Sequence, residues 1–339
     1  MEKLDWSNLG FGYLKADYNV RSVFRDGKWS KLETSTSEFI NIHIAATALH
    51  YGQEAFEGLK AYRGKDGKIR IFRWEENAKR LMNTANGILM APVTLDLFKE
   101  AIFKVVELNE KFVPPYSSGA TLYIRPLLFG SGPEVGVKPS AEYTFLVFVT
   151  PVGPYFKDGM KPVNMMICRD FDRAAPLGTG NLKVGGNYAA SLRAIKQAHE
   201  NGFGNVLFLD ARERKFIDEC GPANFFGIRQ NTYITPKSES ILPSITNMSL
   251  IEIARSLGMK TERRPVPIEE LAEFEEAGAC GTAAVISPIG KIVDIEKNTI
   301  YDYCKDGNPG PVTMKLYKKL IAIQYGDEPD PYGWVTVIK

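Results

Sequence analysis

The pattern of apolar and polar residues along the chain predicts helices and strands in both halves. Apolar residues that recur every three or four positions indicate helices that pack by one face. One helix predicted in this way starts near residue 75, and the others span residues 97–106, 187–200, 250–257 and 311–326. Pro311 suits a first helical turn, and Gly258 and Gly326 suit helix ends, because glycine readily adopts the left-handed conformation found there.

Short runs of β-branched and aromatic residues predict the strands. These runs cover residues 69–73, 120–128, 143–149, 163–168 and 205–210. Two of them, 120–128 and 143–149, are apolar almost throughout, which is typical of strands buried on both faces. We therefore expect strands and helices to alternate in both halves, in an α/β (α+β) chain.

A segment rich in proline and glycine separates the two halves. Residues 151–162 contain three prolines and two glycines between two predicted strands. A chain of 339 residues also exceeds the size of one ordinary hydrophobic core. We predict an N-terminal α/β domain over residues 1–155, a linker over 156–162 and a C-terminal domain over 163–339.

Composition and charge exclude several classes of protein. The chain carries 42 Lys and Arg against 40 Asp and Glu, a net charge of +2, so no broad basic face for nucleic acid is expected. The longest apolar run, near residues 145–149, is far shorter than the ~20 residues of a membrane span, and Met1–Asp5 shows no apolar signal sequence. We expect no nucleic acid partner and no membrane contact.

Cysteine and histidine are sparse and have no metal-binding spacing. The four cysteines are Cys168, Cys220, Cys280 and Cys304, without a C-x-x-C pair, and no two of the three histidines have ligand spacing. This pattern predicts neither a disulfide framework nor a metal site. It is typical of a protein of a reducing compartment, so we expect a cytoplasmic location.

The most informative stretch places Lys183 among four glycines, between Gly178 and Tyr188, just before a predicted helix. Glycines allow a ligand to approach the backbone, and apolar neighbours lower a lysine pKa by desolvating its ammonium. Such an amine can attack a carbonyl and form a Schiff base. Taken alone, a solvated loop lysine explains the pattern more often.

Three further positions offer groups for a phosphorylated ring. Glu219 precedes a predicted strand and could keep a pyridine nitrogen protonated, although a loop or capping carboxylate is the commoner reading of local sequence. The first turn of the helix at Thr246 could bind phosphate, or Thr246 or Asn247 could simply cap that helix. The small residues around Thr282 could form a second anion-binding nest, or pack closely between layers.

These motifs together resemble those of the branched-chain amino acid aminotransferases. The resemblance rests on Lys183 in Asn-Leu-Lys-Val-Gly-Gly-Asn-Tyr, on residues 56–62 (Phe-Glu-Gly-Leu-Lys-Ala-Tyr) and on residues 122–126 (Leu-Tyr-Ile-Arg-Pro). It runs from about Leu32 to the C-terminal helix. It implies the fold-type IV architecture of enzymes dependent on pyridoxal 5′-phosphate (PLP), with a smaller N-terminal domain, a larger C-terminal domain that carries the lysine, and the cofactor between them.

The resemblance also implies residue roles in cofactor binding. Lys183 matches the lysine that forms the Schiff base and moves the proton. Arg80 matches the arginine on the phosphate, Tyr188 the tyrosine on the ring 3-oxygen, and Glu219 the carboxylate on the ring nitrogen. The residues that match those closing round the same phosphate are Ile245, Thr246 and Thr282.

On the substrate side, the resemblance implies an aromatic pocket and two carboxylate contacts. The matching aromatic residues are Tyr51, Phe56, Tyr123 and Tyr155. Thr282 and Ala283 match residues whose N–H groups bind the substrate carboxylate, and Arg125 matches the residue that receives the distal carboxylate of glutamate. Without the resemblance, ordinary core packing would explain the tyrosines.

The expected reaction is transfer of the amino group of L-leucine, L-isoleucine or L-valine to 2-oxoglutarate, in a ping-pong cycle on Lys183, as in branched-chain amino acid biosynthesis. The alternatives are a D-amino acid transaminase or an aminodeoxychorismate lyase-like enzyme of the same fold group. A non-catalytic phosphate-ligand binder is a third, which the joint presence of Lys183, Tyr188, Glu219 and Arg80 argues against. The family also implies a homodimer in which a loop of each chain lines the other's site.

Overall fold

The computed structural model describes residues 4–154 and 159–338, which form two compact units. Unit 1 comprises Met1–Lys157, Leu182–Gly185 and Ala322–Lys339, and unit 2 comprises Asp158–Asn181 and Gly186–Ile321. The main division falls in the predicted linker 156–162, of which residues 156–158 lie outside the described residues. The units differ from the predicted domains in two segments, 182–185 and 322–339, which pack in unit 1 instead of with the C-terminal half.

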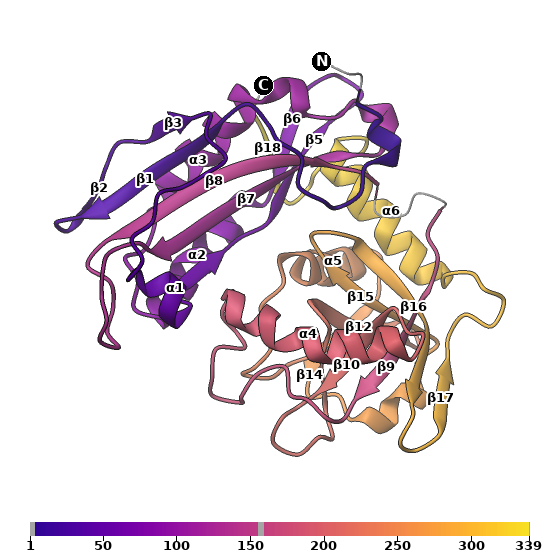
Figure 1. Ribbon diagram of the computed structural model, residues 1–339. Coiled ribbons are helices and arrows are strands. Elements are labelled where there is room, and N and C mark those ends of the chain that lie inside the picture. The colour runs from indigo at the N-terminus through magenta and orange to yellow at the C-terminus, as the bar shows by residue number, and fades with distance from the viewer. Residues whose placement is uncertain (1–3, 155–158, 339) are drawn as a thin grey trace. The chain divides into compact units, whose positions relative to one another are not determined.

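Unit 1 is built on a nine-stranded antiparallel sheet (Figure 1). Its strands are β1 (Asn19–Arg25), β2 (Lys28–Trp29), β3 (Glu33–Ser35), β4 (Glu54–Phe56), β5 (Leu59–Arg63), β6 (Ile69–Phe72), β7 (Thr121–Gly130), β8 (Tyr143–Val152) and β18 (Val335–Val337). The order is β18-β6-β5-β7-β8-β1-β2, with β3 paired to β1 and β4 to β7. The two long apolar runs are the central pair β7 and β8, so their prediction as buried strands is confirmed.

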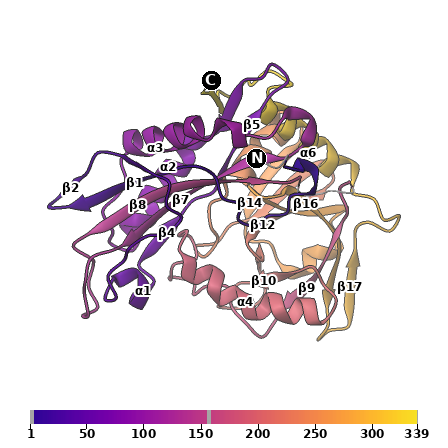
Figure 2. The same ribbon diagram turned by 45° about the horizontal axis from the view of Figure 1, so that its top comes forward.

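Two amphipathic helices cover one face of this sheet (Figures 1 and 2). They are α2 (Trp74–Gly87) and α3 (Leu95–Leu108), which confirm the helices predicted from residue 75 and over 97–106, while the short α1 is Thr47–Tyr51. Leu81 of α2 and Phe98 of α3 are fully buried against sheet residues such as Ile71 and Phe145. The apolar face read from the sequence is thus the face that forms the core of unit 1.

Unit 2 contains a second nine-stranded sheet, part of which closes on itself. Its strands are β9 (Val163–Cys168), β10 (Asn205–Leu209), β11 (Ile217–Cys220), β12 (Ala223–Arg229), β13 (Thr232–Pro236), β14 (Lys260–Arg264), β15 (Glu276–Gly281), β16 (Val285–Asp294) and β17 (Thr299–Asp302). The order is β11-β10-β9-β16-β15-β12-β13-β14, and β11 also pairs with β12. That extra pairing closes the strands from β11 round to β12 into a barrel, which removes two sheet edges.

The alternation of side chains along β9 and β10 builds two cores in unit 2. Met165 and Leu207 face the barrel interior, whereas Met166 and Phe208 face the helix α4 (Gly185–Glu200). Successive residues of a strand point to opposite faces, so one strand serves both cores. Figures 1 and 2 show α4 lying across β9 and β10.

Helices α5 and α6 end near the glycines that predicted their C-terminal ends. Helix α5 (Ile245–Ser256) is followed by Gly258 at φ +78°, and α6 (Pro311–Tyr325) by Gly326 at φ +76°. The 3₁₀ turns are Trp6–Asn8, Glu110–Phe112, Tyr116–Ser118 and Ile268–Ala272. The predicted alternation of strands with helices is wrong over much of the chain, because β4 to β6 and β11 to β13 follow one another with no helix between them.

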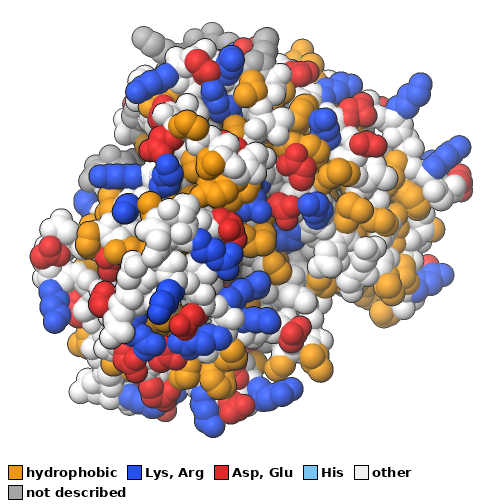
Figure 3. Space-filling model, turned by 180° about the vertical axis from the view of Figure 1, so that it is seen from behind, with side chains coloured by type: hydrophobic (Ala, Val, Ile, Leu, Met, Phe, Trp, Pro, Cys, Tyr) orange, Lys and Arg blue, Asp and Glu red, His pale blue; other side chains and the backbone are white. Residues whose placement is uncertain are grey.

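Basic and acidic side chains are interspersed over the face shown in Figure 3. Within residues 4–154 and 159–338, no helix is long and apolar enough to cross a membrane. In the same part of the chain, no three His, Cys, Asp or Glu side chains are grouped to hold a metal ion. All four cysteines are unpaired.

Candidate active site

The backbone of Lys183 is anchored to unit 1 on both sides. Its N–H donates to Oγ1 of Thr84 in α2 at 3.0 Å, and its carbonyl accepts the N–H of Phe56 in β4 at 3.2 Å. The neighbouring Leu182 is buried against Gly87, where an added Cβ would lie 2.5 Å from Leu182 Cδ1. The segment that carries the lysine is therefore held by elements about a hundred residues earlier in the chain.

An aromatic wall beside Lys183 also carries Arg125. Lys183 Nζ lies 4.6 Å from the centroid of the Phe56 ring, and Arg125 Cζ lies 4.9 Å from the same centroid. Arg125 Nη2 donates to the hydroxyl of Tyr123 at 3.2 Å, while its buried Nε has no partner among the described residues. A buried donor left without a partner is costly, which makes Arg125 a candidate for binding an anion.

Arg80 is held by a fully buried carboxylate. Its Nε and Nη2 donate to the two oxygens of Glu57 at 2.7 and 2.8 Å, and Glu57 has no solvent exposure. Asn77, one turn earlier in α2, donates to the same carboxylate at 2.8 Å. This bidentate geometry fixes the direction of the Arg80 side chain.

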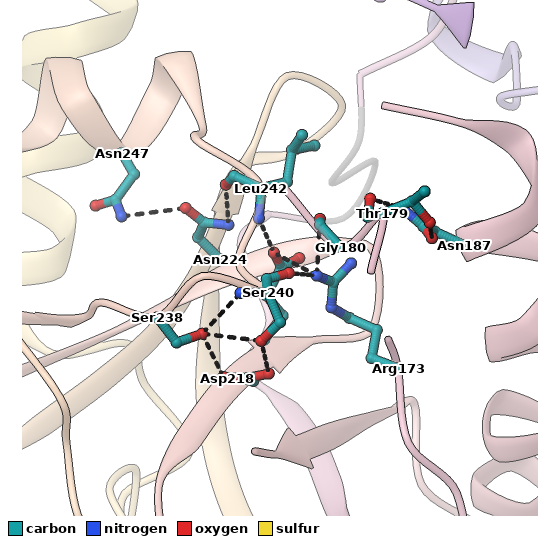
Figure 4. A network of polar contacts seen from close by, with 11 residues as sticks. Arg173, Thr179, Gly180, Asn187, Asp218, Asn224, Ser238, Ser240, Leu242 and Asn247 are labelled. Atoms are coloured by element: carbon teal, nitrogen blue, oxygen red, sulfur yellow. Dashed lines mark hydrogen bonds and ion pairs between the residues drawn. The ribbon is translucent and has the colours of Figure 1, made fainter. Parts of the chain in front are cut away.

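Unit 2 presents a second buried carboxylate, Glu219 on β11, which is 2% exposed. Its Oε1 accepts the N–H of Leu242 at 2.6 Å and lies 3.5 Å from Nη2 of Arg173. Figure 4 shows Asp218 of β11, Leu242 of the segment before α5 and Arg173 of the loop after β9 in the same network of polar contacts. A buried carboxylate held in this way suits a partner that carries a proton on nitrogen.

Helix α5 begins beside this network. Ser244 is its N-cap and accepts the N–H of Asn247 at 3.2 Å, so neither Thr246 nor Asn247 provides the cap. Ile245 and Thr246 are buried in the first turn, where the helix dipole favours negative charge. Asn247 instead donates to Asn224 Oδ1 at 3.2 Å, which ties the helix start to β12 (Figure 4).

Thr282 and Ala283 lie half-buried in the tight turn between β15 and β16. Val285, at the end of this turn, has φ +65°, and the N–H of Ile286 donates to the carbonyl of Ala284 at 2.8 Å. A β-branched residue with positive φ is strained, and such strain concentrates at ligand-binding sites. The turn is therefore held in an unusual conformation by the flanking strands.

A family model described as "Amino-transferase class IV" matches residues 54–292. The chain belongs to the class IV aminotransferases. This membership confirms the predicted fold class, because solved class IV aminotransferases share its fold over nearly the whole chain.

Curated relatives of this class IV aminotransferase match over its full length. "Branched-chain-amino-acid aminotransferase" of Haemophilus influenzae is 50% identical, with 100% of both chains covered. The protein of the same name from Helicobacter pylori is 46% identical over 99% of this chain and 98% of its own. A chloroplastic branched-chain-amino-acid aminotransferase of Arabidopsis thaliana is 43% identical over 99% of this chain and 80% of its own.

Solved structures agree with this class IV aminotransferase in fold. The branched-chain amino acid aminotransferase of Escherichia coli superposes with a TM-score of 0.81 at 27% identity, covering 96% of this chain and 100% of the other. The PLP form of the enzyme from Thermobaculum terrenum gives 0.80 at 25% identity, covering 96% and 99%. A third structure of that name, with pyridoxamine 5′-phosphate, gives 0.79 at 27% identity, covering 96% and 100%. The family of this chain is thus PLP-dependent, as predicted.

Within unit 1 the aminotransferase brings together four predicted site residues, Phe56, Tyr123, Arg125 and Lys183. Tyr51 is not among them, since it is 43% exposed at the end of α1, with its hydroxyl bonded to the carbonyl of Val135. Tyr155 lies outside the described residues. Their roles stay predictions.

In unit 2, Glu219, Ile245 and Thr246 are buried, and Tyr188 lies half-buried in the first turns of α4. The groups that hold the site residues were not predicted from the sequence, namely Glu57, Thr84, Arg173 and Asp218. Only the Phe-Glu-Gly motif offered a signal, by placing Glu57 next to Phe56. For the others, the sequence separation from their partners hides the contact.

Replacing Gly180 by alanine is expected to destabilise unit 2 by about 1–3 kcal/mol. An added Cβ would lie 2.3 Å from the carbonyl oxygen of Ser240, a backbone atom that cannot rotate away. Gly186→Ala is the matched control, because nothing lies within 4 Å of a Cβ there. Equilibrium urea unfolding of both variants measures the difference, and equal stabilities would refute the close approach.

Replacing Asp218 by asparagine is expected to change the pH dependence of stability. Burial raises the pKa of Asp218, against hydrogen bonds from Ser240 and Ser238 and the charge of Arg173. The native state then binds the proton more tightly than the unfolded chain, so this carboxyl favours folding in acid and loses that contribution as pH rises through its native pKa. The stability of D218N should thus rise relative to wild type between about pH 3 and 7. A difference that is constant with pH would contradict this assignment.

Proposed function

We propose that the chain is a branched-chain-amino-acid aminotransferase, which exchanges the amino group of L-leucine, L-isoleucine or L-valine with 2-oxoglutarate. The observation that carries the proposal is a cluster in unit 1, in which the Lys183 amine and the Arg125 guanidinium lie beside the ring of Phe56. The buried Nε of Arg125 has no hydrogen-bond partner among the described residues. The names of relatives at 46–50% identity over almost the whole chain support it. The comparisons do not favour the D-amino acid transaminase or lyase alternatives.

The residues present fit PLP by their chemistry. Arg80, oriented by Glu57, would hold the phosphate together with Ile245 and Thr246 in the first turn of α5. Glu219, buried and bonded to the Leu242 N–H, would face the ring nitrogen. Tyr188 would bond the ring 3-oxygen and Thr282 the phosphate. When bound, PLP supplies an electron sink that stabilises negative charge at the substrate Cα.

Lys183 would hold the cofactor and move the proton. The amine, 4.6 Å from the centroid of the Phe56 ring, would act as the nucleophile in its neutral form. Because its backbone is bonded to both Phe56 and Thr84, the side chain starts from a fixed position. Nζ would therefore take and return the Cα proton with little reorganisation.

The substrate pocket must accept both an apolar side chain and a carboxylate. Phe56, Tyr123 and Tyr155 would form its apolar wall, and Arg125 would bind the distal carboxylate of glutamate. Without that carboxylate, Arg125 still has the Tyr123 hydroxyl and the two aromatic rings as partners. The N–H groups of Thr282 and Ala283 would bind the carboxylate common to both substrates.

The near-ultraviolet and visible spectrum of the purified protein with PLP tests this proposal. Addition of L-leucine should convert the long-wavelength band of lysine-bound PLP to that of pyridoxamine phosphate, and 2-oxoglutarate should restore it. A band moved by D-alanine and not by L-leucine would transfer the assignment to a D-amino acid transaminase. No band with PLP would favour a non-catalytic binding protein.

We further propose a homodimer. Residues 39–51 and 133–137 of unit 1 carry exposed apolar side chains. An isolated β-bridge between Ala46 and Pro133 joins the two segments into one surface. Its most exposed side chains are Phe39, Ile44, Val135 and Val137, each more than 80% exposed. An apolar surface of this kind favours a second copy as its cover, and Tyr51 would then lie at the interface. V135D/V137D should lower the molar mass measured by light scattering, whereas an unchanged mass would refute the surface.

A cytoplasmic location is part of the same proposal. All four cysteines are unpaired, and three of them are buried, as is usual where thiols stay reduced. Fractionation of cells that express the tagged protein tests it, since recovery in a membrane or secreted fraction would overturn it.

A further inference from the structure

A buried network of unlike charges surrounds Glu219. Asp218, the preceding residue on β11, is 2% exposed and accepts hydrogen bonds from Ser238 at 2.9 Å and Ser240 at 2.6 Å. These serines begin the segment that ends at Leu242, whose N–H binds Glu219. The segment is thus fixed by one carboxylate at its start and contacts the other at its end (Figure 4).

Arg173 is the cation of this network. It is 8% exposed, and its Nη2 donates to the carbonyl of Gly180 at 3.0 Å and to that of Ser240. The same nitrogen lies 3.5 Å from Glu219 Oε1, and its buried Nε has no partner among the described residues. The guanidinium therefore contacts both segments next to Glu219 as well as the carboxylate itself.

Other titratable groups also act on this network. The thiols of Cys220 and Cys280 interact with Glu219, and burial raises the pKa of both, so both stay neutral near pH 7. Asp210 acts on Asp218 as a like charge, which adds to the effect of burial in raising the pKa of Asp218. Arg173 therefore brings a positive charge within 3.5 Å of Glu219, and a protonated ring nitrogen facing Glu219 would fit the cofactor of the proposed function.

We propose that Arg173 is a positioning residue that keeps Glu219 ionised and oriented toward the cofactor nitrogen, with Asp218 anchoring the segment between them. The inference rests on the proposed function for the identity of the cofactor ring. The coupling of Arg173 to Glu219 does not depend on the proposed function, because a buried carboxylate stays charged only beside a fixed positive charge or several hydrogen-bond donors. Removing the guanidinium should make Glu219 take up a proton in the neutral range.

The first test uses the protein without added cofactor. In Arg173→Met, the native pKa of Glu219 should move well above that of the unfolded chain, so stability should fall more steeply than in wild type as pH rises from about 5 to 8. Because Arg173 also lowers the pKa of Asp218, the comparison is made in the Asp218→Asn background, where adding Glu219→Gln should abolish the extra dependence. Urea unfolding across this pH range measures D218N, R173M/D218N and R173M/D218N/E219Q.

The second test measures PLP binding by absorbance. If Glu219 in R173M is mostly protonated at pH 6 to 8, the ratio of its PLP dissociation constant to that of wild type should exceed about tenfold, and R173K should stay closer to wild type. Arg169→Met is the matched control, because Arg169 forms an equivalent ion pair with buried Asp294 elsewhere in unit 2. R169M should lose stability and keep wild-type PLP affinity.

The outcomes separate this inference from the proposed function. If wild type binds no PLP, the proposed function fails, while the unfolding data still test the coupling of Arg173 to Glu219. If R173M does not fold, R173M/E219Q should recover folding, because it removes the uncompensated carboxylate. Failure of that rescue, or an extra pH dependence that E219Q does not abolish, would overturn the inference and leave Arg173 as a structural link between two loops.

Discussion

Replacing Lys183 by alanine is expected to lower the rate of transamination by about 10⁴-fold or more. The variant loses both the amine that would bind the cofactor and the base that would move the proton, and a positioned acid–base group alone contributes about 10²–10⁴-fold. The backbone bonds to Phe56 and Thr84 do not involve the side chain, so the fold should be kept. Single-turnover rates with L-leucine and a circular dichroism spectrum measure the two effects.

Lys196→Ala is the matched control for this variant. Lys196 lies on α4, with a side chain 76% exposed and its Nζ 3.6 Å from Glu200 Oε1, so its loss should leave the rate unchanged. The control shows whether the loss of any lysine from this part of the chain lowers the rate. If K183A transaminates at the rate of K196A, the role proposed for Lys183 is wrong.

Replacing Glu57 by alanine is expected to destabilise the protein by about 3–5 kcal/mol, because it removes the buried carboxylate that compensates the charge of Arg80. Both Arg80 bonds to Glu57 are short, at 2.7 and 2.8 Å, and Glu57 is fully buried. The Arg80 side chain, 11% exposed, has little access to water in compensation. Equilibrium urea unfolding measures the loss, and the PLP dissociation constant should rise as Arg80 loses its orientation.

The control for this ion pair lies on the same helix. Lys79 pairs with Glu76 at 2.8 Å, but its side chain is 64% exposed. Lys79→Ala should therefore change stability little, since exposed pairs are solvated and flexible. Comparable losses in E57A and K79A would mean that burial does not set the strength of the Glu57–Arg80 pair.

The period of apolar residues was sufficient to predict the long elements. Helices α2 and α3 and strands β7 and β8 appear within a few residues of their predicted bounds, because the apolar spacing along each reflects which face is buried. The pairing of strands was not predictable in this way. The barrel of unit 2 closes only because strands distant in sequence, such as β9 and β16, pair within the same sheet as β11 and β12.

The sequence by itself determined the family, because membership depends on short motifs in a fixed order, and the same motifs predicted Lys183 as the reactive lysine. The tertiary structure decided what holds these residues. Thr84 lies 99 residues from Lys183, Glu57 lies 23 residues from Arg80, and Arg173 reaches the carbonyl of Ser240, 67 residues away. Such contacts leave no periodic trace in the sequence, since each arises only when separate elements pack together.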